Sequence, residues 1–294
     1  MRLAWVAVVP VKTLATAKSR LAPWSEERRR ALAMAFAVDT VTALRAVPDI
    51  RTVVVVTSDT EVASGVAAGV DPNVEVLAEP AEGGLDTAIT AGVDWSRSRH
   101  SDAGVVVVAA DLPALRPDDI AAVLRAASAH PRTVVADREG TGTTMLTGLP
   151  GSPPRPQFGA DSLSRHRADG AVVIDGSGLD RAARDVDTPD QLDEARRLGV
   201  GAATGQVLRT VLVEGEDRQP FRRQATVAAF EPGTGRGKVL LDDGTRLELP
   251  TGAWRSATGR SLRRGQRVVV HLDAEHGRVR LVHLLTIEPT GEQT

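Results

Sequence analysis

Short apolar runs alternate with helical patterns along the N-terminal two thirds of the chain. Six runs rich in β-branched residues predict strands: Val6–Val9, Thr52–Val56, Val74–Leu77, Gly104–Ala109, Thr133–Ala136 and Ala171–Ile174. Six segments between and after them predict helices: Ser25–Val47, Thr60–Ala68, Leu85–Arg97, Pro117–Ala129, Asp161–His166 and Pro189–Leu198. Ser25 is the expected cap of the first helix, and Pro48 is expected to end it. This alternation predicts an α/β domain with a mostly parallel sheet.

The pattern changes after Gly199. The stretch 199–205 is rich in glycine and alanine, which predicts a linker. Short strands then follow one another with turns between them, at Val227–Phe230, Gly237–Leu241, Arg246–Leu249, Arg267–Leu272 and Val279–Ile287. Asp243-Gly244 is a hairpin signal within this series. We therefore expect two domains, an α/β domain over residues 1–203 and a small all-β barrel over residues 206–294.

Composition narrows the class of protein. The net charge is −2 and the pI about 6.3, so no global basic field indicates binding to nucleic acid. The chain has no cysteine, which excludes disulfides, thiolate metal sites and a cysteine nucleophile, and fits a cytoplasmic location. The apolar start lacks a signal cleavage site, and no stretch approaches the roughly 18 apolar residues of a membrane helix.

The loop after the first predicted strand carries Lys12, Lys18 and Arg20. Three cations at the carboxyl end of a strand are suited to bind the phosphates of a nucleotide. Neither a P-loop nor the glycines of a dinucleotide fingerprint accompany them. A solvated basic loop is the alternative interpretation of the same residues.

Carboxylates follow two further predicted strands or extended segments. Asp111 comes directly after a buried apolar strand, where it is placed to hold a divalent cation such as Mg²⁺, or to cap the next turn. Asp185 and Asp187 are two residues apart in an extended segment and so point the same way. Such like charges need a cation or hydrogen-bond donors beside them. The alternative is that Asp187 or Thr188 caps the next helix, and both roles are compatible.

Two glycine-containing segments, Asp137–Thr144 and Phe158–Leu163, offer backbone N–H groups and hydroxyls to a phosphate or carboxylate. Ordinary turns are the alternative for both. The six histidines contain no close ligand pair and indicate neither a catalytic triad nor a zinc site. Only His166 falls near the predicted site.

Five stretches occur in the order found in one family. They are Pro10-Val-Lys with Ala17-Lys-Ser-Arg-Leu21, Ala110-Asp-Leu-Pro-Ala-Leu115, Ala136-Asp-Arg-Glu-Gly-Thr-Gly-Thr143, Arg155-Pro-Gln-Phe-Gly-Ala-Asp-Ser162 with Arg165-His-Arg167, and Asp185-Val-Asp-Thr-Pro189. Over about residues 3–203 the chain resembles the guanylyltransferases of coenzyme F-420 biosynthesis. These enzymes use GTP and phosphoenolpyruvate or 2-phospho-L-lactate, and release pyrophosphate.

This resemblance implies a nucleotidyltransferase fold of the glycosyltransferase-A type. It implies two Mg²⁺ ions held by Asp111, Asp185 and Asp187, and a phosphorylated acid surrounded by Thr143, Gly159 and Ser162. The downstream transferase of the pathway is then a candidate partner. The resemblance leaves open which of the two acids is the acceptor.

The stretch matching Gly84-Leu85-Asp86 departs from many relatives, which have asparagine where this chain has Asp86. Asp86 can still accept hydrogen bonds from guanine, so guanine remains the expected base. Lys12, Lys18 and Arg20 are expected to favour the departure of pyrophosphate, with Lys18 and Arg20 acting catalytically. The attacking phosphate is already anionic, so the reaction needs no general base.

The C-terminal segment resembles a cold-shock or OB-type barrel, on the Gly-rich turn near residue 235 and the Asp243-Gly244 hairpin. Such barrels stack bases on exposed aromatic side chains. Only Phe221, Phe230 and Trp254 are available here, so a structural or protein-contact role is expected rather than binding to nucleic acid. Two alternatives stay open: transfer to another phosphorylated acceptor such as a sugar phosphate, and a nucleic-acid-binding or regulatory protein acting through the barrel.

Overall fold

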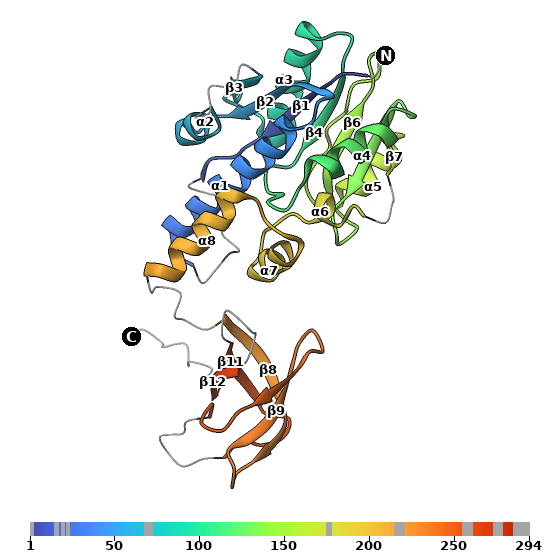
Figure 1. Cartoon of the computed structure of the whole chain (residues 1–294). Helices are drawn as coiled ribbons and strands as arrows, with labels where there is room; N and C mark the ends of the chain where they lie inside the picture. Colours follow the sequence, from blue (N-terminus) through green and yellow to red (C-terminus); the bar gives the residue numbers. More distant parts are fainter. Residues whose placement is uncertain are drawn as a thin grey trace, which may run out of the picture. The chain divides into compact units, whose positions relative to one another are not determined.

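The computed structural model divides into two compact units, Met1–Arg209 and Thr210–Thr294 (Figure 1). It describes residues 3–14, 18, 21, 24–67, 73–174, 178–214, 221–254, 261–272 and 279–284. Each unit has a sheet and a hydrophobic core of its own.

The first unit is built on a seven-stranded sheet in the order β3-β2-β1-β4-β6-β5-β7. Its strands are β1 (Trp5–Pro10), β2 (Ile50–Thr57), β3 (Val74–Ala78), β4 (Gly104–Val108), β5 (Arg132–Ala136), β6 (Thr143–Gly148) and β7 (Val172–Val173). All six strands predicted for this part are confirmed, and the pairs are parallel except those made by β6. β6 was not predicted, because its sequence TTMLTG interrupts the apolar run with threonines and a glycine and directly follows a glycine-rich turn.

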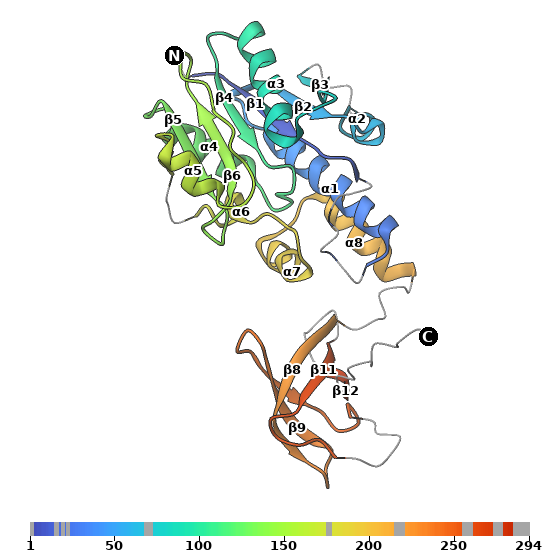
Figure 2. The ribbon, with the colours of Figure 1, turned by 180° about the vertical axis from the view of Figure 1, so that it is seen from behind.

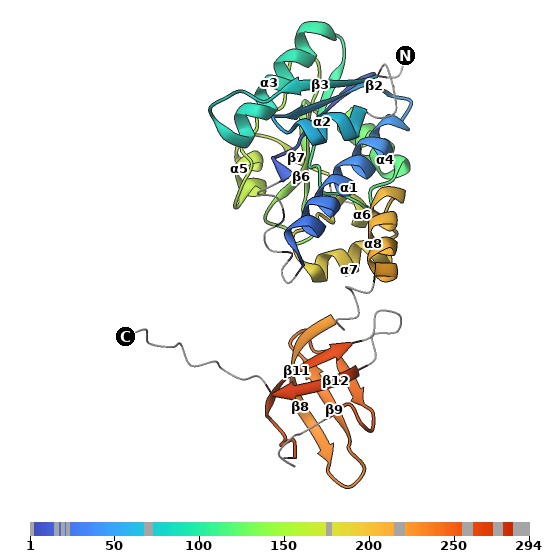
Figure 3. The same ribbon diagram turned by 90° about the vertical axis from the view of Figure 1, so that its left-hand side faces the viewer.

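Helices cover both faces of this sheet (Figures 2 and 3). The helices of this part are α1 (Glu26–Arg45), α2 (Thr60–Ala67), α3 (Gly84–Arg99), α4 (Pro117–Ala127), α5 (Ser162–Ala168), α6 (Asp180–Ala183), α7 (Pro189–Leu198) and α8 (Ala202–Glu214). Of these, α7 and α8 pack against α1 rather than on the sheet. Successive strand residues face opposite layers: Val53 and Val55 belong to the core under α1, α2 and α4, whereas Val54 belongs to the core under α3. No helix in the described residues combines the length and apolar character that a membrane span requires.

Side-chain caps begin two of the predicted helices as expected. The Ser25 hydroxyl accepts a hydrogen bond from the backbone N–H of Arg28 at the start of α1. At α7, the Thr188 hydroxyl accepts from Gln191 N, and the Gln191 side chain accepts from Thr188 N. Thr188 therefore caps α7, which leaves the carboxylates before it available for another role.

The linker predicted over residues 199–205 is wrong, because α8 begins at Ala202 and packs on the first unit. The buried Asp39 carboxylate accepts hydrogen bonds of 2.9 Å from the N–H groups of both Ala203 and Thr204. Residue 201 must be glycine, since a Cβ there would lie 2.3 Å from Asp39 Cγ. Val207 joins a hydrophobic cluster that contains Phe36 of α1. Glycine and alanine serve close packing here rather than flexibility.

The second unit is a five-stranded antiparallel sheet in the order β10-β9-β8-β11-β12. The strands are β8 (Phe221–Glu231), β9 (Arg236–Leu241), β10 (Arg246–Leu249), β11 (Arg267–Leu272) and β12 (Val279–Leu284). They confirm four of the predicted strands in this part, residues 279–284 of the fifth, whose residues 285–287 lie outside the described residues, and the hairpin at Asp243-Gly244, where Gly244 has φ +85°. A single parallel bridge joins Trp254, after β10, to Val282 of β12, so the two ends of the sheet meet there. The resemblance to a cold-shock barrel stays a prediction.

We predict that Asp39→Ala lowers the free energy of unfolding of the first unit by about 2 kcal/mol, because two N–H groups at a helix start lose their acceptor. Chemical denaturation of the full chain, followed by far-UV circular dichroism, measures this change. Asp94→Ala is the control, since that exposed carboxylate makes only an ion pair of 3.6 Å with Arg97 and should cost a few tenths of a kcal/mol. Equal losses in the two variants would contradict the docking of α8 by Asp39.

Candidate active site

Three segments far apart in the sequence meet beside the carboxyl end of β4. Backbone hydrogen bonds join them: Ala109 N donates to Thr144 O (2.9 Å), Val186 N to Asp111 O (3.1 Å) and Arg138 N to Ala183 O (2.9 Å). The segments are therefore 109–111, 137–144 and 183–187. The structure thus brings together the aspartate segments that the sequence predicts at strand ends.

Buried apolar neighbours anchor these aspartates. Leu112 is fully buried beside Asp111, and Val186 is fully buried between Asp185 and Asp187. Because those apolar side chains enter the core, the carboxylates beside them are held at the edge of the sheet. The alternation of apolar and acidic residues in these segments therefore places the three carboxylates at the same edge of the sheet.

Lys18 links two of the carboxylates. Its ammonium group lies 2.5 Å from Asp111 Oδ2 and 2.8 Å from Asp187 Oδ1. Burial lowers the pKa of Lys18, but Asp111 and Asp187 raise it, and the net pKa is above its usual value. The same loop is anchored at Leu14, whose backbone N–H donates to Asp59 (2.9 Å). Lys18 is therefore a charged group held in place.

Asp185 lies beside this pair in an unfavourable environment. Its Oδ1 atom is buried and has no hydrogen-bond partner among the described residues. Burial, followed by the charges of Asp111 and Asp187, raises the pKa of Asp185 to about 7. Three carboxylates facing one ammonium leave the cluster short of positive charge, and a divalent cation would supply it.

The donor set fits Mg²⁺, which takes carboxylate oxygens together with phosphates and water. The unpartnered Asp185 oxygen is the observation that supports the fit. Within the described ranges, no group of three or more acidic or histidine side chains is arranged so that it could hold a metal ion by itself. One or two carboxylates are sufficient for Mg²⁺ where substrate phosphates complete the coordination.

Arg184 supports the segment that carries Asp185, and the sequence analysis did not single it out. It is 2% exposed and forms ion pairs with Glu139 (2.9 Å) and Glu194 (3.2 Å). Burial raises the pKa of Glu139, but hydrogen bonds from Arg184 and Gln191 lower it, and the net pKa is below its usual value. Glu139 therefore stays ionised. The one available sequence signal was an arginine directly before the paired aspartates.

The glycine-rich turn before β6 is closed by its own first residue. The Asp137 carboxylate accepts hydrogen bonds from Thr141 N and Gly142 N, both at 2.8 Å. Residue 142 must be glycine, because a Cβ would lie 2.4 Å from Asp137 Oδ2. These two amides are therefore engaged within the turn, contrary to the expectation that they receive a phosphate or carboxylate.

A second polar cluster, neutral in character, lies at the start of β6 and α5. The Ser162 hydroxyl donates to Thr143 Oγ1 (3.1 Å), and His166 Nδ1 lies 3.0 Å from the same oxygen. Gly159 has φ +107°, a conformation that L side chains rarely adopt. The Asp86 carboxylate borders this neutral cluster without being part of it, and its Oδ1 atom accepts from Phe158 N (2.9 Å).

The predicted nucleotide loop is described only in part. Lys12 is exposed directly after β1, and Lys18 is the cation discussed above. Arg20 lies outside the described residues. The structure therefore groups Lys18 with Asp111, Asp185 and Asp187, and groups Thr143 with Ser162.

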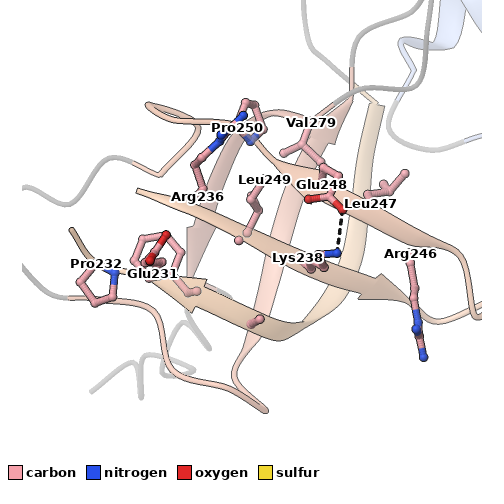
Figure 4. Close-up of a pocket in the computed structure, with 13 residues that line it drawn as sticks. Glu231, Pro232, Arg236, Lys238, Arg246, Leu247, Glu248, Leu249, Pro250 and Val279 are labelled. Atoms are coloured by element: carbon pink, nitrogen blue, oxygen red, sulfur yellow. Dashed lines mark ion pairs between the residues drawn. The ribbon is translucent and has the colours of Figure 1, made fainter. Parts of the chain in front are cut away.

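The second unit carries a separate open groove of about 1030 Å³ (Figure 4). It is lined mainly by β8, β9 and β10, and Lys238 and Glu248 form an ion pair of 3.1 Å within it. Among the described residues that line the groove, Phe230 is the one aromatic. Its lining holds two glutamates on different strands, Glu231 and the ion-paired Glu248, and its single aromatic is not a base-stacking platform of the kind that nucleic-acid barrels use.

Comparison with known proteins relates the chain to a family. The family model described as "Guanylyl transferase CofC like" matches residues 5–169. A phosphoenolpyruvate guanylyltransferase of Streptomyces coelicolor is 44% identical over 213 residues, covering 72% of this chain and 99% of the relative. Another so named, from Thermomonospora curvata, is 38% identical, covering 80% of this chain and 96% of the relative.

A solved structure shares the fold. It comes from Desulfovibrio desulfuricans and is described as a nucleotide-diphospho-sugar transferase, with a TM-score of 0.56 and 15% identity over 71% of this chain and 95% of that one. At this identity the likeness concerns the fold alone. It agrees with the predicted glycosyltransferase-A type of α/β domain.

We predict that the contribution of Asp185 to the stability of the metal-free protein falls between about pH 4 and pH 7, because Asp185 has a higher pKa folded than unfolded. The protonated carboxyl is stable in its buried position, and that advantage is lost as the pH rises through 7. Asp185→Asn should remove this loss and raise Tm at pH 8 in a chelator by about 2–4 °C. Thermal melts at several pH values measure the effect.

The matched control is Asp118→Asn, on the exposed first turn of α4. It should leave the pH profile parallel to that of the parent. A difference between Asp185→Asn and the parent that is constant from pH 4 to pH 8 would show that Asp185 does not titrate in this range.

Proposed function

Because the chain belongs to the CofC-like guanylyl transferase family, we propose that it transfers GMP from GTP to phosphoenolpyruvate or 2-phospho-L-lactate in coenzyme F-420 biosynthesis. Pyrophosphate is the second product. The names of the relatives favour phosphoenolpyruvate as the acceptor. The observation that carries the proposal is the Lys18 ammonium between Asp111 and Asp187, beside the buried and unpartnered Asp185 oxygen.

In this proposal Asp111, Asp185 and Asp187 hold Mg²⁺, with two ions as the family resemblance implies. When bound, Mg²⁺ offsets the negative charge of the two phosphates that react. The positive charge would also compensate the burial and the neighbouring negative charges that raise the pKa of Asp185. A cation bound between the three carboxylates would offset their mutual repulsion.

The protein's own cations act on the nucleotide phosphates. A phosphate oxygen of the acceptor forms a bond to the α-phosphorus of GTP as the bond to the pyrophosphate oxygen breaks. Lys18 is placed to compensate the charge of the departing pyrophosphate, with Lys12 and Arg20 contributing from the same loop. The attacking oxygen carries no proton to remove, so the chemistry needs no general base.

The neutral cluster is proposed to bind the acceptor. Thr143, Gly159 and Ser162 lie around the start of β6, which is joined to the Asp111 segment through a hydrogen bond to Thr144. Asp86 is proposed to accept hydrogen bonds from guanine through its Oδ2 atom, since its Oδ1 atom accepts from Phe158 N. Both substrates are cytoplasmic metabolites, so we place the reaction in the cytoplasm, with the transferase that consumes the product as a partner.

We predict that Asp111→Asn, Asp185→Asn and Asp187→Asn each lower kcat at saturating Mg²⁺ by at least about a hundredfold, because each removes charge from the metal site. Pyrophosphate release with GTP and phosphoenolpyruvate measures the rate, and a melt checks folding. The control is Asp118→Asn, which should retain the parent rate. A folded variant within about threefold of the parent would remove that residue from the metal site.

The choice of substrates has its own outcome. Product mass after incubation with each nucleoside triphosphate and each acid identifies the pair. Turnover with a sugar phosphate but with neither acid would replace the proposal by another nucleotidyltransferase. Binding of nucleic acid without turnover would move the function to the second unit.

We predict that Lys18→Ala raises KM for GTP by about tenfold or more and changes KM for the acid less, because the cation faces the nucleotide phosphates. Initial rates with one substrate varied at a time measure both constants. Lys12→Ala tests the exposed end of the same loop and should have a smaller effect. Equal rises in both KM values for Lys18→Ala would assign Lys18 to the metal site rather than to GTP.

A further inference from the structure

His166 is buried in the neutral cluster and makes two hydrogen bonds of opposite kind. It is 1% exposed. The backbone N–H of Gln157 donates to its Nε2 atom (3.0 Å), and its Nδ1 atom lies 3.0 Å from Thr143 Oγ1. The Phe158 ring packs edge-on against the imidazole, with ring centroids 5.2 Å apart. The imidazole is therefore held on three sides.

These contacts determine the tautomer. An amide N–H always donates, so Nε2 must be the unprotonated nitrogen that accepts. In a neutral imidazole the hydrogen then lies on Nδ1, which donates to Thr143 Oγ1. Burial lowers the pKa of His166 below its usual value, in agreement with a neutral ring. The histidine is thus a donor toward Thr143.

The Thr143 hydroxyl receives a second donor. Ser162, which is 1% exposed, donates to the same oxygen at 3.1 Å. A hydroxyl oxygen has two acceptor positions and one hydrogen. With both acceptor positions taken by Ser162 and His166, the hydrogen of Thr143 must point to another acceptor. Thr143 is half-buried, whereas Ser162 and His166 are enclosed.

We infer that His166 is a positioning residue that, together with Ser162, orients the Thr143 hydroxyl as a donor to an anionic oxygen of the acceptor acid. This inference rests on the proposed function for the identity of the ligand. His166 neither gives nor takes a proton, because both of its nitrogens are engaged and the ring is buried.

Two substitutions separate the two bonds of His166. The side-chain amide of asparagine lies near the place of Nδ1 and can still donate to Thr143. That of glutamine reaches the place of Nε2 and can accept from Gln157 N but not donate to Thr143. His166→Gln should therefore raise KM for phosphoenolpyruvate by about tenfold, with KM for GTP within about twofold of the parent. His166→Asn should have a KM for phosphoenolpyruvate closer to that of the parent than to that of His166→Gln.

A double-variant cycle supplies the second readout. Thr143→Val keeps the shape of the side chain and removes the hydroxyl. If His166 acts through Thr143, adding His166→Gln to Thr143→Val should raise the acid KM no further. The inference would be overturned if the double variant raised the acid KM by the product of the two single fold-changes. It would also be overturned if His166→Gln and the parent had equal acid KM values. A general loss of fold would instead lower Tm and change both KM values together.

The tautomer can be measured without any substrate. Nitrogen-15 NMR of the full chain, with His166→Gln to assign the signal, should show His166 neutral near pH 7 and protonated at Nδ1. A ring protonated at Nε2, or at both nitrogens, would overturn the inference whatever the enzyme's substrate is. Absence of transfer by the parent protein would count against the proposed function alone.

Discussion

The repulsion among Asp111, Asp185 and Asp187 is the constraint on which the rest of the site depends. Burial, followed by the charges of Asp111 and Asp187, raises the pKa of Asp185, so the ionised carboxylates are unfavourable together without a counter-charge. Lys18 compensates part of that negative charge, at 2.5 and 2.8 Å from two of the acids. The unfavourable arrangement lies at the carboxyl end of β4, beside the segments 137–144 and 183–187, and it leaves the site short of positive charge.

The surrounding fold keeps the acids from moving apart. Leu112 and Val186 anchor their segments in the core, and a backbone hydrogen bond joins Val186 N to Asp111 O. Arg184 holds the same segment through two glutamates, although it lies next to the carboxylates in sequence. Its charge is thus compensated by Glu139 and Glu194 rather than by Asp185. The scaffold therefore supplies rigidity without neutralising the site.

The two polar clusters of the first unit differ in their physical character. One is charged and built from side chains that need a cation, whereas the other is a set of neutral hydrogen bonds around Thr143. Such a division suits two ligands with different demands, a triphosphate and a small acid. The buried histidine belongs to the neutral cluster, where its burial keeps it uncharged and gives it a fixed direction.

The sequence by itself determined the strands with continuous apolar runs, the helix caps at Ser25 and Thr188, and the carboxylates at strand ends, because these depend on period and local chemistry. Residues 199–205 were predicted wrongly as a linker, and β6 was not predicted. The structure of such glycine-rich and short mixed segments depends on the residues that pack against them. The positions of Arg184 and His166 were likewise decided by tertiary structure. The partners of buried polar groups are set by contacts between segments distant in the chain. The local sequence pattern does not predict those contacts.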